Sequence, residues 1–391
     1  MKIAALLLAS YFLIITVSPV LSRIYFVTIE NKASNTGHPA GRDQQKENEK
    51  DTAFTLLFGG DMMGHMSLVQ TAYSPETMDY SYLHWFRFVE NYVQSADLAV
   101  ANLEVTLGGK PFTGYPQFSS PDAYARDISK AGFDLLVTSN NHCQDRGRKG
   151  LERTIAVLDS MKIAHTGTFS DTLQRKQRYP LLMKVAGTKI AFINATFGTN
   201  GLYVEHPNYV NTLDTAEMKN DIIKARKEGA DFIISVLHWG EEYNIVENAG
   251  QRAIADALAS AGCDLIIGMH PHVVEPVRTI ELNSGGKRKL VPVVYSLGNF
   301  VSSQRKRYTD GGIMMKVFCT RHKGIVKIEK MEYLPFWVYT GGAGEENFDR
   351  KKGFYMIPED KINLLPESEQ GNARSFFRDT KDILKDFRSQ Y

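Results

Sequence analysis

The chain has 391 residues, of which 43% are hydrophobic and 23% charged, and its formal net charge is +2. This composition is typical of a folded globular protein and not of a disordered one. Near-neutrality argues against a nucleic-acid partner, because such proteins usually carry a concentrated basic face. The three cysteines, Cys143, Cys263 and Cys319, are too scattered for a disulfide framework. We therefore expect free, mostly buried thiols.

The N-terminus carries a targeting signal. Lys2 precedes an apolar run from Ile3 to Val17, and small residues follow near position 22, an order typical of a secretory signal peptide. The stretch is also almost long enough to span a bilayer, so an uncleaved anchor is the alternative. Either way, residues 1–22 predict export, with the chain anchored in the cell membrane or placed on its periplasmic or extracellular face. Residues 23–52 follow as a polar linker.

Short apolar strands alternate with helical stretches from residue 54 onward, which predicts an α/β fold with layers built around mixed sheets. We expect strands at 54–58, 98–101, 133–138, 232–237, 265–267, 277–282, 291–295, 313–318 and 324–333, and a hairpin over 181–194. We expect helices at 82–94, 121–131, 149–161, 215–228, 251–261 and toward 383. Residues 53–340 are assigned to one domain and 341–391 to a C-terminal extension packed on it.

Polar residues recur where these strands stop, and sites in layered α/β folds gather at the carboxyl ends of strands. The residues at these positions are Asp61, Glu104, Asn141, His142, His238, His270 and His272. Their mixed oxygen and nitrogen donors suit zinc, manganese or iron better than calcium. Each also has a structural explanation: Asp61 could cap a helix, and Asn141 could serve a turn. The coincidence of all of them favours a metal site.

Six motifs occur in order along the chain. They are Gly60-Asp61-Met62-Met63-Gly64, Ala101-Asn102-Leu103-Glu104, Ser139-Asn140-Asn141-His142 with Asp145, His238-Trp239-Gly240-Glu241-Glu242-Tyr243, Gly268-Met269-His270-Pro271-His272 and Ser296-Leu297-Gly298-Asn299-Phe300. Over roughly 54–302 they resemble the CapA/PgsA family, which is associated with poly-γ-glutamate capsule synthesis. That family is in turn similar to calcineurin-like metallophosphoesterases. The resemblance implies an α/β/β/α sandwich and a site for two divalent transition metal ions (Mn, Zn or Fe).

Carried over by position, the resemblance assigns a role to each residue. Asp61 and His272 would bind the first ion, Glu104 would bridge, and Asn141, His238 and His270 would complete the second. Asp61 and His142 would be the catalytic residues, with His142 outside the coordination sphere as a general acid or an electrostatic stabiliser. The chain departs from the phosphoesterase pattern at Met63, where that pattern has a histidine. His65 is the candidate substitute, and a helix-surface position is its alternative.

Several nearby residues have two interpretations each. His270-Pro271-His272 places two imidazoles so that they can face the same way from an extended loop. Glu241 and Glu242 could orient a water or a histidine beside a metal, or be solvated charges. Trp239 and Tyr243 could line a substrate groove or pack in the core. Arg146 and Arg148 could bind phosphate or a polyanion, or be surface charge.

The expected function is that of an extracytoplasmic capsule biosynthesis protein with a metal-dependent phosphoesterase or hydrolase site. Its substrate would be a phosphoester or an anionic polymer, and its partner the membrane-associated capsule synthesis machinery. Amide cleavage of a peptide-like polymer would use the same residues. The alternative is a non-catalytic factor that binds or exports an anionic capsule polymer.

Overall fold

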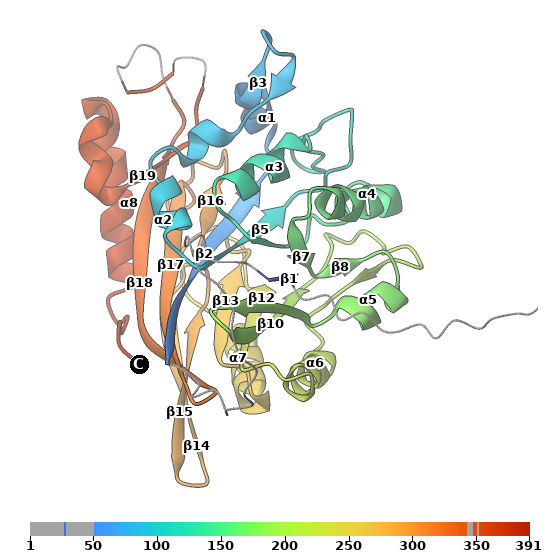
Figure 1. The fold of residues 1–391 in the computed structure, drawn as a ribbon. Helices are drawn as coiled ribbons and strands as arrows, with labels where there is room; N and C mark the ends of the chain where they lie inside the picture. Colours follow the sequence, from blue (N-terminus) through green and yellow to red (C-terminus); the bar gives the residue numbers. More distant parts are fainter. Residues whose placement is uncertain (1–26, 29–50, 342–346, 350–351) are drawn as a thin grey trace, which may run out of the picture.

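Two β-sheets face each other in the computed structural model, which describes residues 27–28 and 51–391 except 342–346 and 350–351 (Figure 1). The first sheet pairs, in order, β1 (Val27–Thr28), β9 (Leu181–Val185), β10 (Thr188–Thr196), β12 (Phe232–His238), β13 (Leu265–Met269), β15 (Lys287–Val294) and β14 (Val277–Ser284). The second pairs β19 (Tyr355–Pro358), β18 (Ile325–Tyr339), β17 (Gly311–His322), β2 (Thr52–Met63), β5 (Leu98–Glu104), β6 (Leu135–Val137) and β7 (Ala164–Thr166). A short strand, β16 (Asn299–Val301), also pairs with β2.

The sheets pack through alternate residues of their strands, because successive side chains point to opposite faces. On β2, Leu56 and Phe58 enter the core between the sheets, while Leu57 packs under the helices outside. On β12, Ile234 enters the same inner core and Ile233 the outer one. The central strands of both sheets are therefore buried on both faces.

Helices cover the two outer faces. The second sheet is covered by α1 (Met66–Ala72), η1 (Leu83–Phe86), α2 (Glu90–Gln94), α3 (Ala123–Lys130) and α4 (Gly147–Ser160). The first is covered by α6 (Thr215–Lys227) and α7 (Ala249–Ala261). The remaining elements are α5 (Thr172–Arg178), β3 (Tyr73–Ser74), β4 (Asp79–Tyr80), β8 (Thr168–Phe169), β11 (Tyr209–Val210) and η2 (Glu359–Leu364). The prediction of an α/β/β/α sandwich with mixed sheets is confirmed.

Most expected elements occur, and the differences have physical reasons. The helix expected over 82–94 is broken into η1 and α2, because Val89 (φ −121°) leaves helical geometry between them. Strand β2 runs past its expected end to include Asp61, since β5 and β16 pair with it on both sides there. Gly60 permits that pairing, because a Cβ atom would lie 2.0 Å from the Gly298 carbonyl oxygen.

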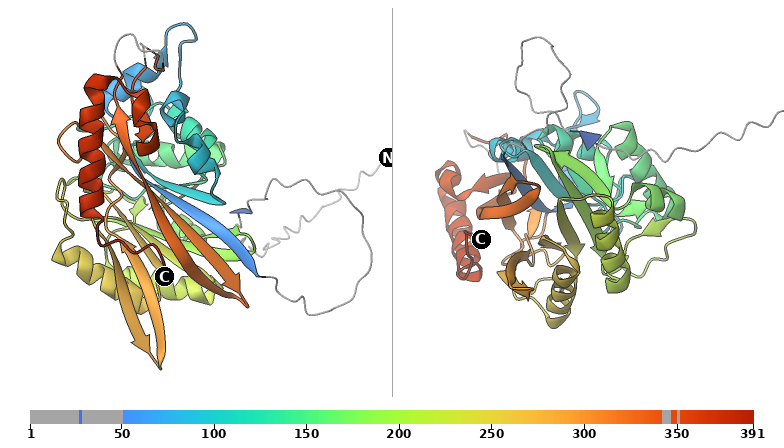
Figure 2. Two further views of the ribbon diagram at one scale, coloured as in Figure 1. Left: turned by 90° about the vertical axis from the view of Figure 1, so that its left-hand side faces the viewer. Right: turned by 60° about the horizontal axis from the view of Figure 1, so that its bottom comes forward.

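The C-terminal segment completes the second sheet. Strand β19 pairs with β18, and α8 (Glu367–Ile383) lies against β18 (Figures 1 and 2). Phe376 and Phe377 of α8 pack on Trp337 and Ile357 of the sheet. The β14–β15 hairpin turns at 285–286 and projects from the body (Figure 2). The domain limits drawn from the sequence stay a prediction.

The cysteines match their expected role as free, buried thiols. Cys143 packs with Leu151, Ile155 and Val210. The predicted signal or anchor at 1–22 and most of the 23–52 linker lie outside the described residues. Within the part of the chain that the structure describes, no helix has the length and apolar character needed to span a bilayer.

Candidate metal centre

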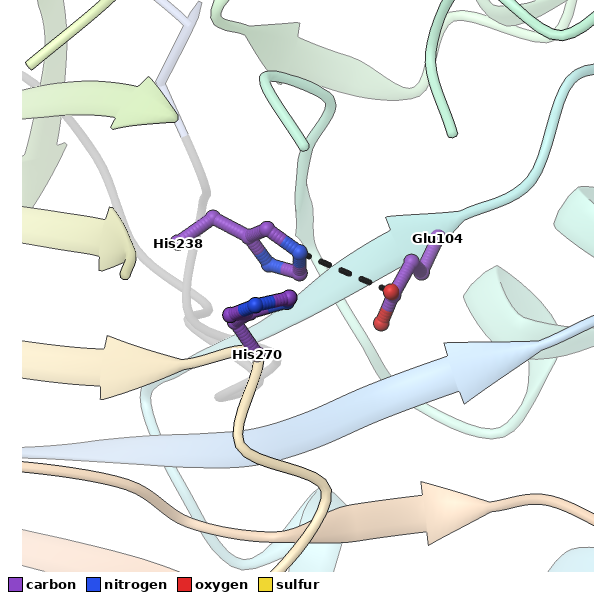
Figure 3. Close-up of side chains that lie close together, drawn as sticks. All are labelled: Glu104, His238 and His270. Atoms are coloured by element: carbon purple, nitrogen blue, oxygen red, sulfur yellow. Dashed lines mark ion pairs between the residues drawn. The ribbon is translucent and has the colours of Figure 1, made fainter. Parts of the chain in front are cut away.

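The metal-competent residues converge at the carboxyl ends of four strands. Asp61 lies near the end of β2, Glu104 ends β5, His238 ends β12, and His270 follows β13. Figure 3 shows His238 and His270 facing the Glu104 carboxylate from the opposite sheet. The parallel pairing of β2 with β5 and of β12 with β13 brings these ends together. Their convergence was predicted from the strand-end pattern.

Glu104 lies at the centre of the cluster. Its Oε1 atom is 3.5 Å from His238 Nε2 and 3.9 Å from His272 Nε2. The side chain is fully buried, and neither carboxylate oxygen forms a hydrogen bond with the described residues. Burying an unpaired carboxylate is costly, so such a group is normally protonated, paired or bound to a metal. The unpartnered oxygens fit a cation at this position.

Two sets of donors share Glu104. The ligand-type atoms within each set lie within 4.8 Å of one another: Glu104, His238 and His270 in one, and Asp61, Glu104 and His272 in the other. Asn141 joins the first set, since its Oδ1 atom lies 2.9 Å from His238 Nε2. This division matches the two ion positions that the resemblance implies. Metal ligation by these residues stays a prediction.

A polar network that the sequence reasoning gave no role orients the donors. The Asn102 amide donates to Asp61 Oδ1 at 2.8 Å and lies 3.2 Å from His238 Nδ1. Asn140 donates in turn to Asn102 Oδ1 at 2.9 Å. Asn200 Oδ1 accepts a hydrogen bond from the Asn141 amide nitrogen at 3.2 Å. The motif containing Asn102 was visible in the sequence, but its cross-strand contacts require the paired sheet.

The two histidines after β13 adopt left-handed backbone, with φ +104° at His270 and +58° at His272. The expectation of an extended loop was therefore wrong: the chain turns tightly about Pro271. Such a conformation costs a residue with a side chain about 1–3 kcal/mol, and it persists where the surroundings impose it. The His270 N–H donates to Asp61 Oδ2 at 3.0 Å, which ties the turn to the opposite sheet. This hydrogen bond helps to keep the turn, and with it both imidazoles, beside the carboxylates.

Burial and mutual charge shift the titrations of the site. Burial, followed by the charge of Asp61, raises the pKa of Glu104 well above its usual range. Burial also raises the pKa of Asp61, but His272, His238 and Asn102 outweigh it and hold that pKa below its usual range. Burial and the neighbouring imidazoles lower the pKa of His238, and that of His270 to about 3. His238 and His270 are therefore neutral at physiological pH, the form that binds metals.

His142 lies beside the donor sets and belongs to neither. Its Nδ1 atom is 2.7 Å from Asp145 Oδ2, which also accepts the Phe118 backbone N–H at 2.7 Å. Because Oδ2 is an acceptor, His142 Nδ1 carries the proton in this contact. Both side chains are buried.

Neither residue considered for the missing imidazole joins a donor set. Met63 packs in the core under the helices of the second sheet. His65 is the residue before α1, and its Nδ1 atom accepts the Ser303 N–H at 3.5 Å. Burial, with His272 and His142 nearby, lowers the pKa of His65 to about 4. Among the described residues, His65 belongs to none of the groups that could hold a metal.

Other predicted neighbours separate into core and rim. Trp239 is buried and donates to the Tyr295 carbonyl, so it belongs to the core. Tyr243 is 42% exposed, with its ring centroid 6.2 Å from that of His272. Phe197, which the sequence reasoning missed, is half-exposed and lies 4.4 Å from the His270 ring. Its signal was its position directly after a strand.

A cavity of about 700 Å³ lies beside His65, and none of the residues of the two donor sets lines it. It is lined by His65, Tyr115, Gln117, Arg146 and Ser303, among others. Arg146 therefore lies where it can meet an anionic ligand, whereas Arg148 pairs with Glu152 at 2.8 Å.

Comparisons with known proteins identify relatives of this chain. The family model described as bacterial capsule synthesis protein PGA_cap matches residues 55–304. The chain is 28% identical over 274 residues to the capsule biosynthesis protein CapA of Bacillus anthracis, covering 67% of this chain and 62% of that protein. It is 29% identical over 231 residues to the PGA biosynthesis protein CapA of Bacillus subtilis, covering 56% and 57%. The match thus spans about three-fifths of each relative's length.

Solved structures give a more distant likeness. A Haemophilus influenzae NAD nucleotidase aligns with a TM-score of 0.45 and 14% identity, covering 87% of this chain and 64% of that chain. The calcineurin-like phosphoesterase YfkN from Bacillus subtilis aligns with a TM-score of 0.40 and 13% identity, covering 73% and 90%. Likeness at this level implies nothing about activity.

Proposed function

The chain belongs to the bacterial capsule synthesis protein family, and from that membership we propose that it is an extracytoplasmic capsule biosynthesis protein with a metal-dependent hydrolase site. Its substrate would be a phosphoester, or an anionic polymer such as poly-γ-glutamate, whose backbone bonds are amides. It would work beside the membrane-associated capsule synthesis machinery.

One observation carries the metal-dependent part of this proposal. Both oxygens of Glu104 are buried without a hydrogen bond, between His238 and His272. The Nδ1 atoms of His270 and His272 are likewise buried without one. Imidazole nitrogens and carboxylate oxygens that are buried together with no hydrogen-bond partner among the described residues suit a divalent transition metal. We assign two ions of Mn, Zn or Fe to the two donor sets that share Glu104.

When bound, divalent ions would act as Lewis acids that polarise a substrate oxygen and lower the pKa of water. The chain's own residues have separate tasks. Asp61 and Glu104 supply negative charge, and Asn102 holds Asp61 in place. His142 donates its Nδ1 proton in a hydrogen bond to Asp145. This orientation would leave Nε2 to exchange a proton with the leaving group.

Two features near the site would contact an approaching substrate. A cavity is lined by His65 and Arg146, and a guanidinium there suits a phosphate or carboxylate of the substrate. Phe197, which is half-exposed, offers an apolar surface beside the His270 ring.

Metal analysis of protein purified without chelators, paired with a screen of phosphomonoesters and phosphodiesters, tests the proposal. We expect about two transition metal ions per chain and an activity that chelation abolishes. Asp61→Asn and His270→Ala should each remove both metal and activity. A protein that holds no metal, and whose biological activity survives both substitutions, would contradict the proposal.

A non-catalytic role is the second candidate, favoured by the names of the relatives and by Arg146 in the cavity. In this role the domain binds or helps export an anionic capsule polymer. It requires that metal-free protein bind poly-γ-glutamate and that Arg146→Ala weaken this binding. Absence of binding by the metal-free protein excludes it.

A further inference from the structure

A carboxylate lies at the open side of the metal centre. Glu242 forms a third group with His270 and His272, whose ligand-type atoms all lie within 4.8 Å of one another. Of the six side chains in the three groups, Glu242 is exposed and the other five are buried. From the sequence alone this carboxylate could orient a water or a histidine, or be a solvated charge.

The loop that carries Glu242 is held against the turn that carries the two histidines. The backbone N–H of Tyr243 donates to the Pro271 carbonyl oxygen at 2.8 Å. Gly240 has φ +96°, and a Cβ atom there would lie 3.1 Å from Pro271 Cγ. A glycine is therefore needed for the chain to pass this close. These contacts place the backbone on both sides of Glu242 relative to His272.

The two ion positions have unequal donors. One has four donor side chains: Glu104, His238, His270 and Asn141. The other has three: Asp61, Glu104 and His272. Two divalent ions also carry four positive charges, of which two buried carboxylates cancel only half. Glu242 is grouped with one histidine of each position, and the position of His272 is the one with fewer donors. Uncompensated charge in a buried site is costly, so a further carboxylate at that position improves both the donor number and the charge balance.

We propose that Glu242 is a metal ligand that closes the Asp61–Glu104–His272 position from the solvent side. This inference rests on the proposed function, because it requires a metal centre. The bound ion is a divalent transition metal ion, which Glu242 contacts through a carboxylate oxygen. Because Glu242 is exposed, it is also the protein donor that an incoming substrate anion can displace at the least cost in desolvation.

Titration of the metal-stripped protein with Mn²⁺ tests the assignment, with free Mn²⁺ counted by its electron paramagnetic resonance signal. We expect two bound ions in the wild type. Glu242→Gln keeps the shape of the side chain and removes its charge. It should lower the binding affinity for one ion about tenfold or more and leave the affinity for the other unchanged. The matched control is Glu241→Gln, an exposed neighbour outside the three groups, which should bind both ions as the wild type does.

The outcomes separate this inference from the proposed function. Wild-type affinities at both positions in Glu242→Gln overturn the inference and leave the metal centre standing. A wild type that binds neither Mn²⁺ nor Zn²⁺ overturns the proposed function and the inference with it. His238→Ala should lower the affinity for the other ion, whose binding Glu242→Gln leaves unchanged. If both variants weaken the same ion, Glu242 does not serve the position assigned to it.

Discussion

His142 and Asp145 form a buried pair in which the imidazole Nδ1 atom lies 2.7 Å from the carboxylate Oδ2 atom. The ring also lies edge-on to Phe118, with 4.5 Å between the ring centroids. The hydrogen bond and the aromatic contact together fix the plane of the imidazole. This imidazole belongs to neither donor set, so its position does not depend on metal ligation.

His142→Ala should therefore separate catalysis from metal binding. We expect kcat for phosphoester hydrolysis to fall about 10²–10⁴-fold, the range typical of a lost general acid. Metal stoichiometry should stay at the wild-type value, because His142 is in neither donor set. Steady-state kinetics and metal analysis on the same preparation check both points. Loss of metal from this variant would mean that His142 is a ligand.

Glu104→Gln should stabilise the metal-free protein while removing its metal. Burial raises the pKa of Glu104 above its usual range, so the folded state holds a proton that the unfolded state releases as pH rises. This residue therefore destabilises the metal-free fold above the ordinary carboxyl pKa, and the amide does not. Thermal unfolding at pH 7 should show a gain of about 1–3 kcal/mol without metal.

Added Mn²⁺ is the control for that measurement. It should raise the Tm of the wild type, because a ligand that binds the folded state stabilises it, and should leave Glu104→Gln unchanged. If the metal-free variant is less stable than the metal-free wild type, the assignment of Glu104 as a metal-binding carboxylate without a hydrogen-bond partner is contradicted.

Asn102→Ala should weaken metal binding without removing any ligand. The amide donates to Asp61 and contacts His238, so its loss removes one of the contacts that orient each of these side chains toward the ions. Partners that orient metal ligands typically contribute about 10–100-fold in affinity. Competition with a chromophoric chelator measures this change. The comparison variant is Asn200→Ala, whose side chain accepts a hydrogen bond from Asn141, and it should weaken the binding of only the ion next to His238.

Glu275 predicts a pH dependence outside the metal centre. Burial raises its pKa from 4.5 to about 8, and Gln251 donates to it at 2.7 Å. Between those pH values the folded state binds a proton that the unfolded state does not, so stability falls as pH rises. Each pH unit in that window costs up to about 1.4 kcal/mol.

Glu275→Gln keeps an acceptor for Gln251 and should remove this slope. Urea unfolding from pH 5 to pH 9 should show the variant gaining over the wild type up to about pH 8 and then levelling. Glu281→Gln, on the exposed side of strand β14, should follow the wild-type curve. A slope that persists in Glu275→Gln would assign the titration to another group.

The local pattern of the chain determined most of the fold and the membership of the site. Apolar runs of strand length and periodic helices indicated a layered α/β protein, because those periods reflect which faces are buried. Asp61, Glu104, Asn141, His238, His270 and His272 were picked out because each stands where an apolar strand stops. Six ordered motifs then indicated the capsule synthesis family.

Tertiary structure alone decided what each of these residues touches. Strand pairing carried β2 through Asp61, and the turn about Pro271 put two histidines into left-handed backbone. Tertiary packing also places Asn102 in hydrogen-bond contact with Asp61 and Met63 in the core. The exposed Glu242 lies beside His270 and His272. The physical reason is that such contacts join residues far apart in the chain, 41 positions for Asp61 and Asn102 and 209 for Asp61 and His270. Sequence patterns report the neighbours along the chain, while the distances that define a metal centre depend on how two sheets pack.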